Sequence, residues 1–310
     1  MARIIAADAD GVAEAAKLLE EGQVVVLPTE TVYGLAARAD RTEAVAQIYR
    51  IKGRPLFNPL IVHVANMAMA ESLAVFDERA RDLAERFWPG PLTLVLPARE
   101  RSGIVAAVTA GLPTVAIRQP AHPVARAVLE TVDLPLAAPS ANRSFGISPT
   151  TAEHVISSLG DAAPPILDGG ACEAGLESTI VALRSNDSWQ LLRPGPISQE
   201  ALIDILGPEE KSRGATLEAP GQMAKHYSPG KPLRLQADTA GSEEFHISFG
   251  DADGDFSLSP TGNLAAAAAR LYEALHAAAA SARPKIAVAP IPDRGIGAAI
   301  NDRLRRAAAT

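Results

Sequence analysis

Cysteine, aromatic residues and basic charge are all scarce in this sequence. Its 310 residues include a single cysteine, Cys172, which excludes a disulfide scaffold and a cysteine-rich zinc site. Aromatic residues make up only 4%, and the formal net charge of −7 argues against a protein that coats nucleic acid. The N-terminus has no apolar core of signal-peptide length, and the longest apolar helical stretch, 264–282, is mostly alanine. We therefore expect a globular cytoplasmic protein.

Common motifs for nucleotide binding and hydrolysis are missing as well. A GxxxxGK[ST] phosphate loop is absent, because Gly230-Lys231 is followed by proline. The nearest approach to GxGxxG starts at Gly295 and lacks the third glycine. HExxH, GxSxG and CxxC do not occur, so a zinc protease and a serine hydrolase are unsupported. The informative residues must lie in other loops.

Short apolar runs alternate with helical patterns over the first two thirds of the chain. Buried strands are predicted at 24–27, 60–62, 92–96, 114–117, 136–138, 165–167, 179–183 and 190–192. Helices are predicted at 12–19, with Asp10 as a candidate N-cap, and at 42–51, 77–87, 123–132 and 151–159. This alternation predicts an α/β domain that binds its ligand at strand ends. It leaves open whether the sheet is parallel or mixed.

The texture of the sequence changes after a short helix predicted at 199–206. Residues 208–232 are rich in glycine, proline and charge, which is typical of a linker. The apolar runs 233–235 and 286–289 and the alanine-rich helix 264–281 then predict a second, small α/β domain. The expected organisation is a first domain at 1–207, a linker at 208–232 and a second domain at 233–310.

Two loops are candidates for binding an anion. Lys52 and Arg54 stand in a loop that prolines and Asn58 make rigid, directly before a predicted strand. Such a charge pair is usually a solvated face, but arginine forms paired hydrogen bonds with phosphate oxygens, which favours an anion site here. The polar loop 138–150 offers hydroxyls and backbone N–H groups suited to phosphate. Its alternative role is only to cap the helix that begins near Thr151.

More polar groups stand at the ends of other predicted strands. The loop 28–35 places two hydroxyls, a carboxylate and a phenol around a tight turn. Arg118 ends an apolar run, where a buried arginine needs a carboxylate or phosphate partner, whereas His63 would more often be a satisfied core residue. The segments 176–179 and 192–195 border strands too. Each motif is weak alone, and their shared position at strand ends supports one crevice.

Several strings match one known family in order and spacing. They are PTETVYGL (28–35), IKGRPLFNPLIVHV (51–64), FWPGPLTLVL (87–96), TVAIRQP (114–120), APSANRSFGISPT (138–150), LDGG (167–170), ESTIV (177–181) and LRPG (192–195). Together they resemble the YrdC-like threonylcarbamoyl-AMP synthases in their long form, which has an extra C-terminal domain. The segments 219–233 and 297–306 resemble that form's linker and C-terminal end.

The resemblance implies an enzyme, a nucleotidyltransferase that makes threonylcarbamoyl-AMP and pyrophosphate from L-threonine, bicarbonate or CO2, and ATP. A downstream tRNA threonylcarbamoyl transferase complex would then modify adenosine 37 of tRNAs that read codons starting with A. The implied α/β fold is a twisted sheet with helices around a concave basic cavity, joined to a small Rossmann-like domain. Mg²⁺ is expected to accompany the triphosphate, without a dedicated metal site in the protein.

The resemblance also assigns residues to each substrate. The ATP site would comprise Lys52, Arg54, Asn58, Thr114, Ser140, Ser148, Arg193 and Tyr227, with Lys52 and Arg54 as the catalytic cations. The threonine site would comprise Thr31, His63, Arg118, Ala138 and Ser178, with Arg118 gripping the carboxylate through two hydrogen bonds. Tyr227 would fold over the nucleotide, which makes 219–231 a lid that limits hydrolysis of the labile carbamate.

Two other functions remain open at this point. A basic concave face would suit RNA, and YrdC-like relatives have been linked to double-stranded RNA, but the acidic total charge counts against this as the main function. A carbamoyltransferase with another acceptor is the second alternative. Such enzymes normally carry further domains, which this sequence lacks.

Overall fold

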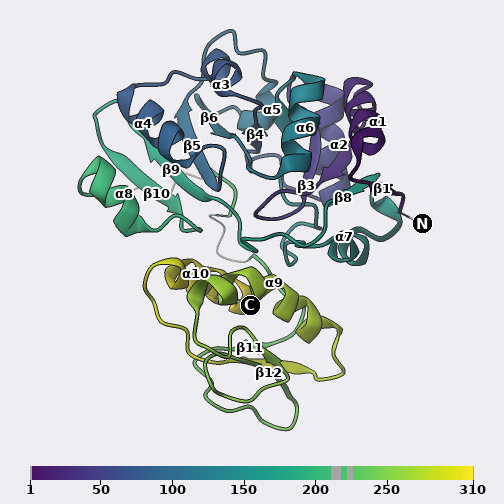
Figure 1. The fold of residues 1–310 in the computed structure, drawn as a ribbon, viewed down its shortest axis with the longest axis vertical. Coiled ribbons are helices and arrows are strands. Elements are labelled where there is room, and N and C mark those ends of the chain that lie inside the picture. Colours follow the sequence, from purple (N-terminus) through teal and green to yellow (C-terminus); the bar gives the residue numbers. More distant parts are fainter. Residues whose placement is uncertain (1, 211–217, 222–225, 310) are drawn as a thin grey trace.

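Two β-sheets, one large and one small, organise the computed structural model (Figure 1). The structure describes residues 2–210, 218–221 and 226–309, so residues 211–217 and 222–225 of the predicted linker lie outside the described residues. Within the described ranges, ten strands form the large sheet and four strands form the small one. The expected α/β fold, a large twisted sheet with a small second α/β unit, is confirmed.

The large sheet is mixed, which answers the question that the sequence left open. In spatial order its strands are β1 (Ile4–Ala6), β8 (Ile166–Asp168), β2 (Val25–Leu27), β3 (Gly34–Arg38), β7 (Leu136–Ala137), β4 (Ile61–His63), β6 (Thr114–Arg118), β5 (Leu92–Pro97), β9 (Thr179–Leu183) and β10 (Trp189–Arg193). β4 and β6 run parallel, whereas β3, β7 and β4 pair antiparallel. This order sets His63 directly beside Arg118 at the ends of their strands.

Helices cover both faces of the large sheet, because its strands contribute to two hydrophobic cores. In β2, Val26 faces one core while its neighbours Val25 and Leu27 face the other, as the two-residue period of a strand requires. α1 and α6 pack together on one face, and α2, α4 and α7 line the other core. The helices of this unit are α1 (Ala9–Glu20), α2 (Thr42–Lys52), α3 (Met67–Leu73), α4 (Glu78–Phe87), α5 (Ala106–Thr109), α6 (Pro123–Val132), α7 (Ala152–Leu159) and α8 (Gln199–Leu206).

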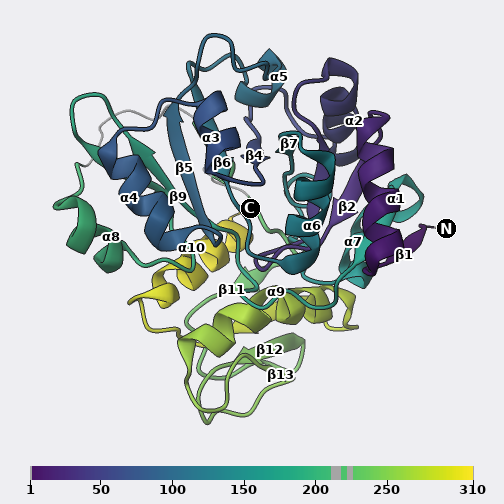
Figure 2. The ribbon, with the colours of Figure 1, turned by 45° about the horizontal axis from the view of Figure 1, so that its top comes forward.

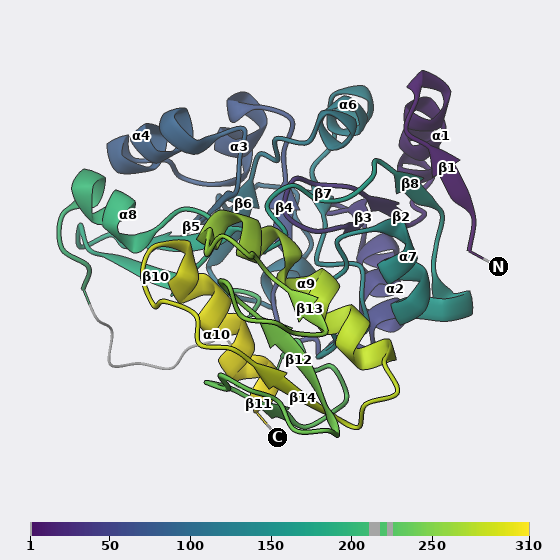
Figure 3. The same ribbon diagram turned by 60° about the horizontal axis from the view of Figure 1, so that its bottom comes forward.

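The second unit consists of a small parallel sheet and two long helices. Its strands, in spatial order, are β11 (Leu233–Arg234), β14 (Lys285–Val288), β12 (Glu244–Ser248) and β13 (Phe256–Ser257). Its helices are α9 (Leu264–Ala280) and α10 (Ile296–Ala308). Both helices lie between the small sheet and the first unit (Figures 1 and 2), and Figure 3 gives the view from the small sheet's end.

The hydrophobic core of the second unit extends into the first. Val32, Leu176 and Tyr227 belong to the same buried cluster as Leu271 of α9 and Ile300 of α10. Burial of this shared apolar surface holds the two units together, since it is the main favourable term in such contacts. The second unit therefore packs directly against loops at the ends of the large sheet's strands.

Most predicted elements occur, with small shifts at their ends, and the helices at 123–132 and 199–206 match in full. The sequence analysis missed β1, β3, β12, β13, α3, α5 and α10. The N-cap of α1 is Asp8 rather than Asp10, because the Asp8 carboxylate accepts a hydrogen bond from the Gly11 N–H. Thr151 does cap α7.

No helix in the described ranges is long and apolar enough to span a membrane.

The cap assignment predicts that substitution of Asp8 lowers stability more than substitution of Asp10. Asp8→Ala removes the capping carboxylate and is expected to lower the free energy of unfolding by about 1 kcal/mol. Asp10→Ala removes only a charge from the first turn and should cost about half as much. Chemical denaturation of both variants checks this, and a larger loss for Asp10→Ala would contradict the assignment.

Candidate functional site

A cavity lies where the strand ends of the large sheet meet the linker. In the described parts of the chain it is lined by Thr29, Thr31, Val32, Gly34, Arg54, Ile61, His63, Arg118, Ala138, Pro139, Ser140, Glu177, Ser178, Arg193, Pro220, Gly221, His226 and Tyr227. Most of these residues stand in the strands of the large sheet or in the adjoining loops, near strand ends as the sequence predicted, and the last four come from the linker. The space inside that is open to the centres of water-sized molecules is about 40 Å³, which is enough to hold water.

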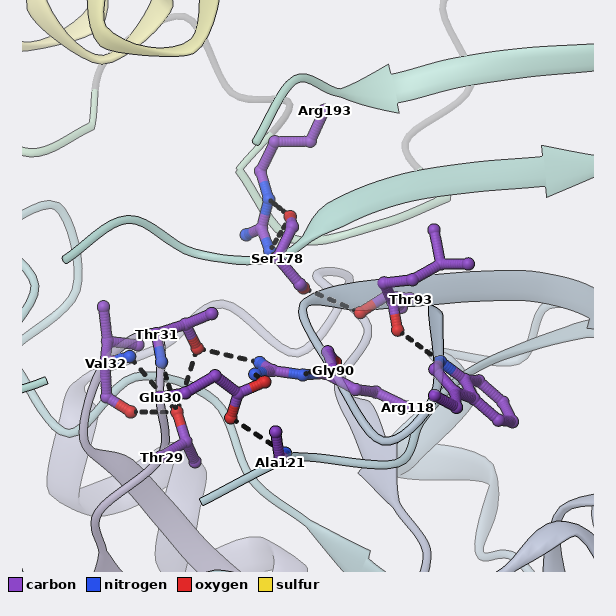
Figure 4. Close-up of polar contacts among 12 residues, drawn as sticks. Thr29, Glu30, Thr31, Val32, Gly90, Thr93, Arg118, Ala121, Ser178 and Arg193 are labelled. Atoms are coloured by element: carbon purple, nitrogen blue, oxygen red, sulfur yellow. Dashed lines mark hydrogen bonds and ion pairs between the residues drawn. The ribbon is translucent and has the colours of Figure 1, made fainter. Parts of the chain in front are cut away.

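One wall of the cavity is a hydrogen-bond network around Arg118 (Figure 4). The guanidinium donates from Nη2 to Glu30 Oε1 at 2.6 Å, from Nη1 to Thr31 Oγ1 at 2.9 Å and from Nε to the Gly90 carbonyl at 3.1 Å. Glu30 also accepts the Ala121 N–H at 3.1 Å. The expected carboxylate partner of Arg118 is thus confirmed as Glu30. Contacts with described residues use three of the five guanidinium N–H groups, and the other two could serve a ligand.

His63 stands beside Arg118 with an unused ring nitrogen. Burial and the neighbouring Arg118 charge lower the pKa of His63 to about 3, so its imidazole is neutral at physiological pH. Its Nδ1 is buried, with no hydrogen-bond partner among the described residues. His63 is thus buried, as a core residue would be, but its ring is not fully satisfied by described residues. A buried, unpaired ring nitrogen in a cavity wall points to a polar ligand.

Three buried cations surround the other side of the cavity. The Lys52 ammonium donates to the carbonyls of Ser140 and Asn142. Arg54 donates from Nε and Nη2 to carbonyls in its own loop, at 3.1 and 2.8 Å. Arg193 donates to the Ser178 carbonyl from Nε and Nη2, at 3.0 and 2.9 Å (Figure 4).

None of these three cations forms an ion pair with a described residue. Burial lowers the pKa of all three: that of Arg54 falls to about 10, and that of Lys52 falls well below its usual range, with the Arg54 charge contributing. Carbonyl dipoles satisfy the N–H groups but leave net positive charge in a desolvated site. Such a site favours an anion with several charges.

Both Lys52 and Arg54 are buried, at 3% and 9% exposure, so this charge pair is not a solvated face. Lys52 is the last residue of α2 and not part of the loop. It lies behind the cavity wall formed by Ser140, whose carbonyl it contacts, and it does not line the cavity itself.

The structure brings together nine of the thirteen residues assigned by resemblance. Those that line the cavity are Thr31, Arg54, His63, Arg118, Ala138, Ser140, Ser178, Arg193 and Tyr227. Lys52, Asn58 and Ser148 are buried and do not line it. Thr114 is farther away, because it begins β6 while Arg118 ends that strand, about 13 Å along an extended chain.

Glu177 is a functional candidate that the sequence analysis did not single out. Its Oε1 accepts the Ser148 hydroxyl at 2.6 Å, and its Oε2 accepts Tyr272 Oη at 2.7 Å and Arg303 Nε at 2.9 Å. Although burial acts to raise it, the charges of Arg303 and Arg193 hold the pKa of Glu177 at about 2. A carboxylate directly before a strand was a visible signal, but its partners lie far away in the sequence.

The linker supplies the remaining wall. His226 and Tyr227 both line the cavity, and Tyr227 is fully buried with its hydroxyl unpaired among the described residues. Its φ of 62° lies in the left-handed region, which a bulky residue adopts only when its surroundings hold it there. The neighbouring residues 222–225 of the predicted lid lie outside the described residues.

Comparison with known proteins identifies relatives along the whole chain. Residues 17–195 match the family model described as "Telomere recombination", and residues 197–309 match "Threonylcarbamoyl-AMP synthase, C-terminal domain". A threonylcarbamoyl-AMP synthase of Bacillus subtilis is 40% identical over 96% of this chain and 92% of its own. One from Pyrococcus abyssi is 38% identical over 94% of this chain and 92% of its own.

Solved structures of related proteins share the fold of this chain. P. abyssi Sua5 complexed with L-threonine superposes with a TM-score of 0.89 at 34% identity, over 99% of this chain and 97% of its own. Escherichia coli YciO shares the fold of the first unit, with a TM-score of 0.55 at 20% identity over 63% of this chain and 96% of its own.

The low pKa of Glu177 predicts how stability responds to acid. Because the folded pKa of about 2 lies below the ordinary value of 4.5, the ionised carboxylate stabilises the fold above about pH 4.5. This stabilisation is lost as the pH falls toward 2. Glu177→Gln should therefore be less stable than wild type at pH 6, with a smaller difference at pH 3, as measured by urea denaturation.

The exposed Glu85 provides the control for this measurement. Glu85→Gln should follow the wild-type dependence on pH throughout. A Glu177→Gln variant whose deficit is equal at pH 3 and pH 6 would show that the folded protein does not lower the pKa of this carboxyl.

Proposed function

Because the chain belongs to the threonylcarbamoyl-AMP synthase family, we propose that it makes threonylcarbamoyl-AMP and pyrophosphate from L-threonine, bicarbonate or CO2, and ATP. The observation that carries this proposal is the set of three buried cations without carboxylate partners among the described residues: Lys52, Arg54 and Arg193. Their charge matches a triphosphate, and binding one would relieve their mutual repulsion.

The chemistry requires charge neutralisation more than a covalent nucleophile. The threonine amine attacks CO2, or bicarbonate with loss of water, and gives a carbamate. A carbamate oxygen then attacks the α-phosphorus of ATP, and the bond to the β-phosphate oxygen breaks to release pyrophosphate. Preorganised cations stabilise the negative charge that builds on the departing pyrophosphate. We assign this role to Arg54 and Arg193 at the cavity wall, and to Lys52 through its charge behind the Ser140 loop.

We place threonine against the Arg118 wall. The two N–H groups of Arg118 that have no partner in the described part of the chain would bind the carboxylate of threonine, with Thr31, Ser178 and the backbone at Ala138 nearby. His63, neutral and with Nδ1 unpaired, would contact the substrate's polar groups. The P. abyssi structure with L-threonine supports a threonine site in this fold.

We place ATP on the cation side, under the linker. Asn58, Ser140, Ser148 and Thr114 complete the proposed site, and Mg²⁺ would enter bound to the triphosphate. Tyr227, at the cavity wall, would lie over the bound nucleotide and exclude water from the labile carbamate.

We also propose the domain limits and the cellular role. The matched segments 17–195 and 197–309 support a catalytic domain at 1–207, a linker at 208–232 and a second domain at 233–310. The product would pass in the cytoplasm to a tRNA-modifying transferase, because an acyl-type adenylate is an activated donor that needs an acceptor.

Pyrophosphate release from ATP by the purified protein tests the proposed reaction. Release should require both L-threonine and bicarbonate, and serine should replace threonine poorly. Pyrophosphate release that does not depend on threonine would indicate a carbamoyl-transfer reaction with another acceptor. No release under any condition would overturn the proposal.

Single substitutions test the role of the cations. Lys52→Met and Arg54→Gln each remove one positive charge from the site, and kcat for pyrophosphate release should fall by about 100-fold to 1,000-fold. Arg50→Gln is the matched control, because Arg50 is exposed on the same helix turn, and it should stay within about twofold of wild type. Thermal unfolding of each variant establishes that it is folded. Near-normal turnover of folded Lys52→Met and Arg54→Gln would remove both residues from the site.

A further inference from the structure

A buried polar cluster joins the two units next to the cavity, and the proposed function leaves its second-unit members unused. Glu177 lies at its centre, Ser148 and Tyr227 contribute from the first unit and linker, and Tyr272 and Arg303 contribute from α9 and α10. Both second-unit side chains are fully buried. The ionised carboxylate of Glu177 thus accepts three hydrogen bonds in the buried interface between the two units, and such a buried charge calls for a role.

The cluster controls the carboxylate of Glu177. Tyr272 Oη and Arg303 Nε bind the same oxygen, Oε2, at 2.7 and 2.9 Å. Arg193 donates to the carbonyl of Ser178, the residue next to Glu177, and both Glu177 and Arg193 line the cavity. Glu177 is therefore the one carboxylate on the cavity wall near the ATP-side cations, among the residues described.

The same two side chains hold Tyr227. The Arg303 guanidinium carbon lies 5.4 Å from the centre of the Tyr227 ring, within the range of a cation–π contact. The Tyr272 ring stacks on that ring with 5.6 Å between centroids and 27° between planes. Tyr227 thus lines the cavity while its ring packs on side chains of α9 and α10.

We propose that Arg303 and Tyr272 are positioning residues for the ATP site. They hold the Glu177 carboxylate on the side of the second unit, so that it forms its ion pair with Arg303 and not with Arg193, and the charge of Arg193 stays available to phosphate. They also hold the Tyr227 ring at the cavity. This inference rests on the proposed function. Without Arg303, Glu177 would pair with Arg193, whose charge already acts on it, and would neutralise charge that the triphosphate requires.

Steady-state kinetics of pyrophosphate release tests this inference. Arg303→Met should raise the KM for ATP by about tenfold or more, the scale of one hydrogen bond to a charged group, while the KM for threonine changes less than twofold. Tyr272→Phe removes one donor and keeps the ring, so a smaller rise in the same KM is expected. Arg303→Lys retains the charge and should recover part of the loss.

A double variant separates positioning from plain structural support. In Arg303→Met combined with Glu177→Gln, the charge that would neutralise Arg193 is gone, so the KM for ATP should return toward wild type. A purely structural role predicts that the two losses add. Arg305→Gln, on an exposed position of the same helix, is the control and should match wild type.

The outcomes distinguish this inference from the function on which it rests. If wild type releases no pyrophosphate with threonine, the proposed function fails first. If wild type is active and Arg303→Met leaves the KM for ATP unchanged, or raises both KM values equally, the inference is overturned. Should Arg303→Met fail to fold, Tyr272→Phe and Arg303→Lys carry the same test.

Discussion

Burial of positive charge is the constraint on which the rest of this site depends. Taking a cation out of water costs several kcal/mol unless it is paired, and Arg118 and Arg303 meet that cost with Glu30 and Glu177. Lys52, Arg54 and Arg193 have carbonyl oxygens instead, which satisfy their N–H groups without cancelling their charge. The protein thus holds a charged, dry surface that is complete only when a polyanion binds.

Glu30 and Glu177 each pair with a buried arginine, but on different sides of the cavity. Glu30 pairs with Arg118 on the side where threonine is proposed to bind, so that wall is close to neutral and offers directed N–H groups. Glu177 is drawn toward the second unit by Tyr272 and Arg303. The second unit is therefore part of the site's electrostatics, and its helices and the linker tyrosine form one packed cluster.

The sequence predicted the elements whose signal is local. The apolar runs of β6 and β9 and the proline-started helix α6 were found because burial and capping act within a few residues. β3 was missed because it is rich in glycine and alanine, and α10 because it begins after Gly295 without a capping side chain and buries Arg303. Arg118's need for an anionic partner followed from physics alone. The Glu177 cluster could not be predicted, since its contacts to Tyr272 and Arg303 span 95 and 126 residues.

The central claim is that three buried cations, which form no ion pair with a described residue, attract the phosphates of ATP. A calorimetric comparison of nucleotides tests it most directly. ATP, ADP, AMP and adenosine share the same base and sugar and differ only in phosphate charge. Affinity should fall steeply along that series, with adenosine binding weakly, because each lost phosphate leaves more of the charge of Lys52, Arg54 and Arg193 uncompensated. Equal affinity for adenosine and ATP would contradict the account, because the phosphates would then not meet these cations.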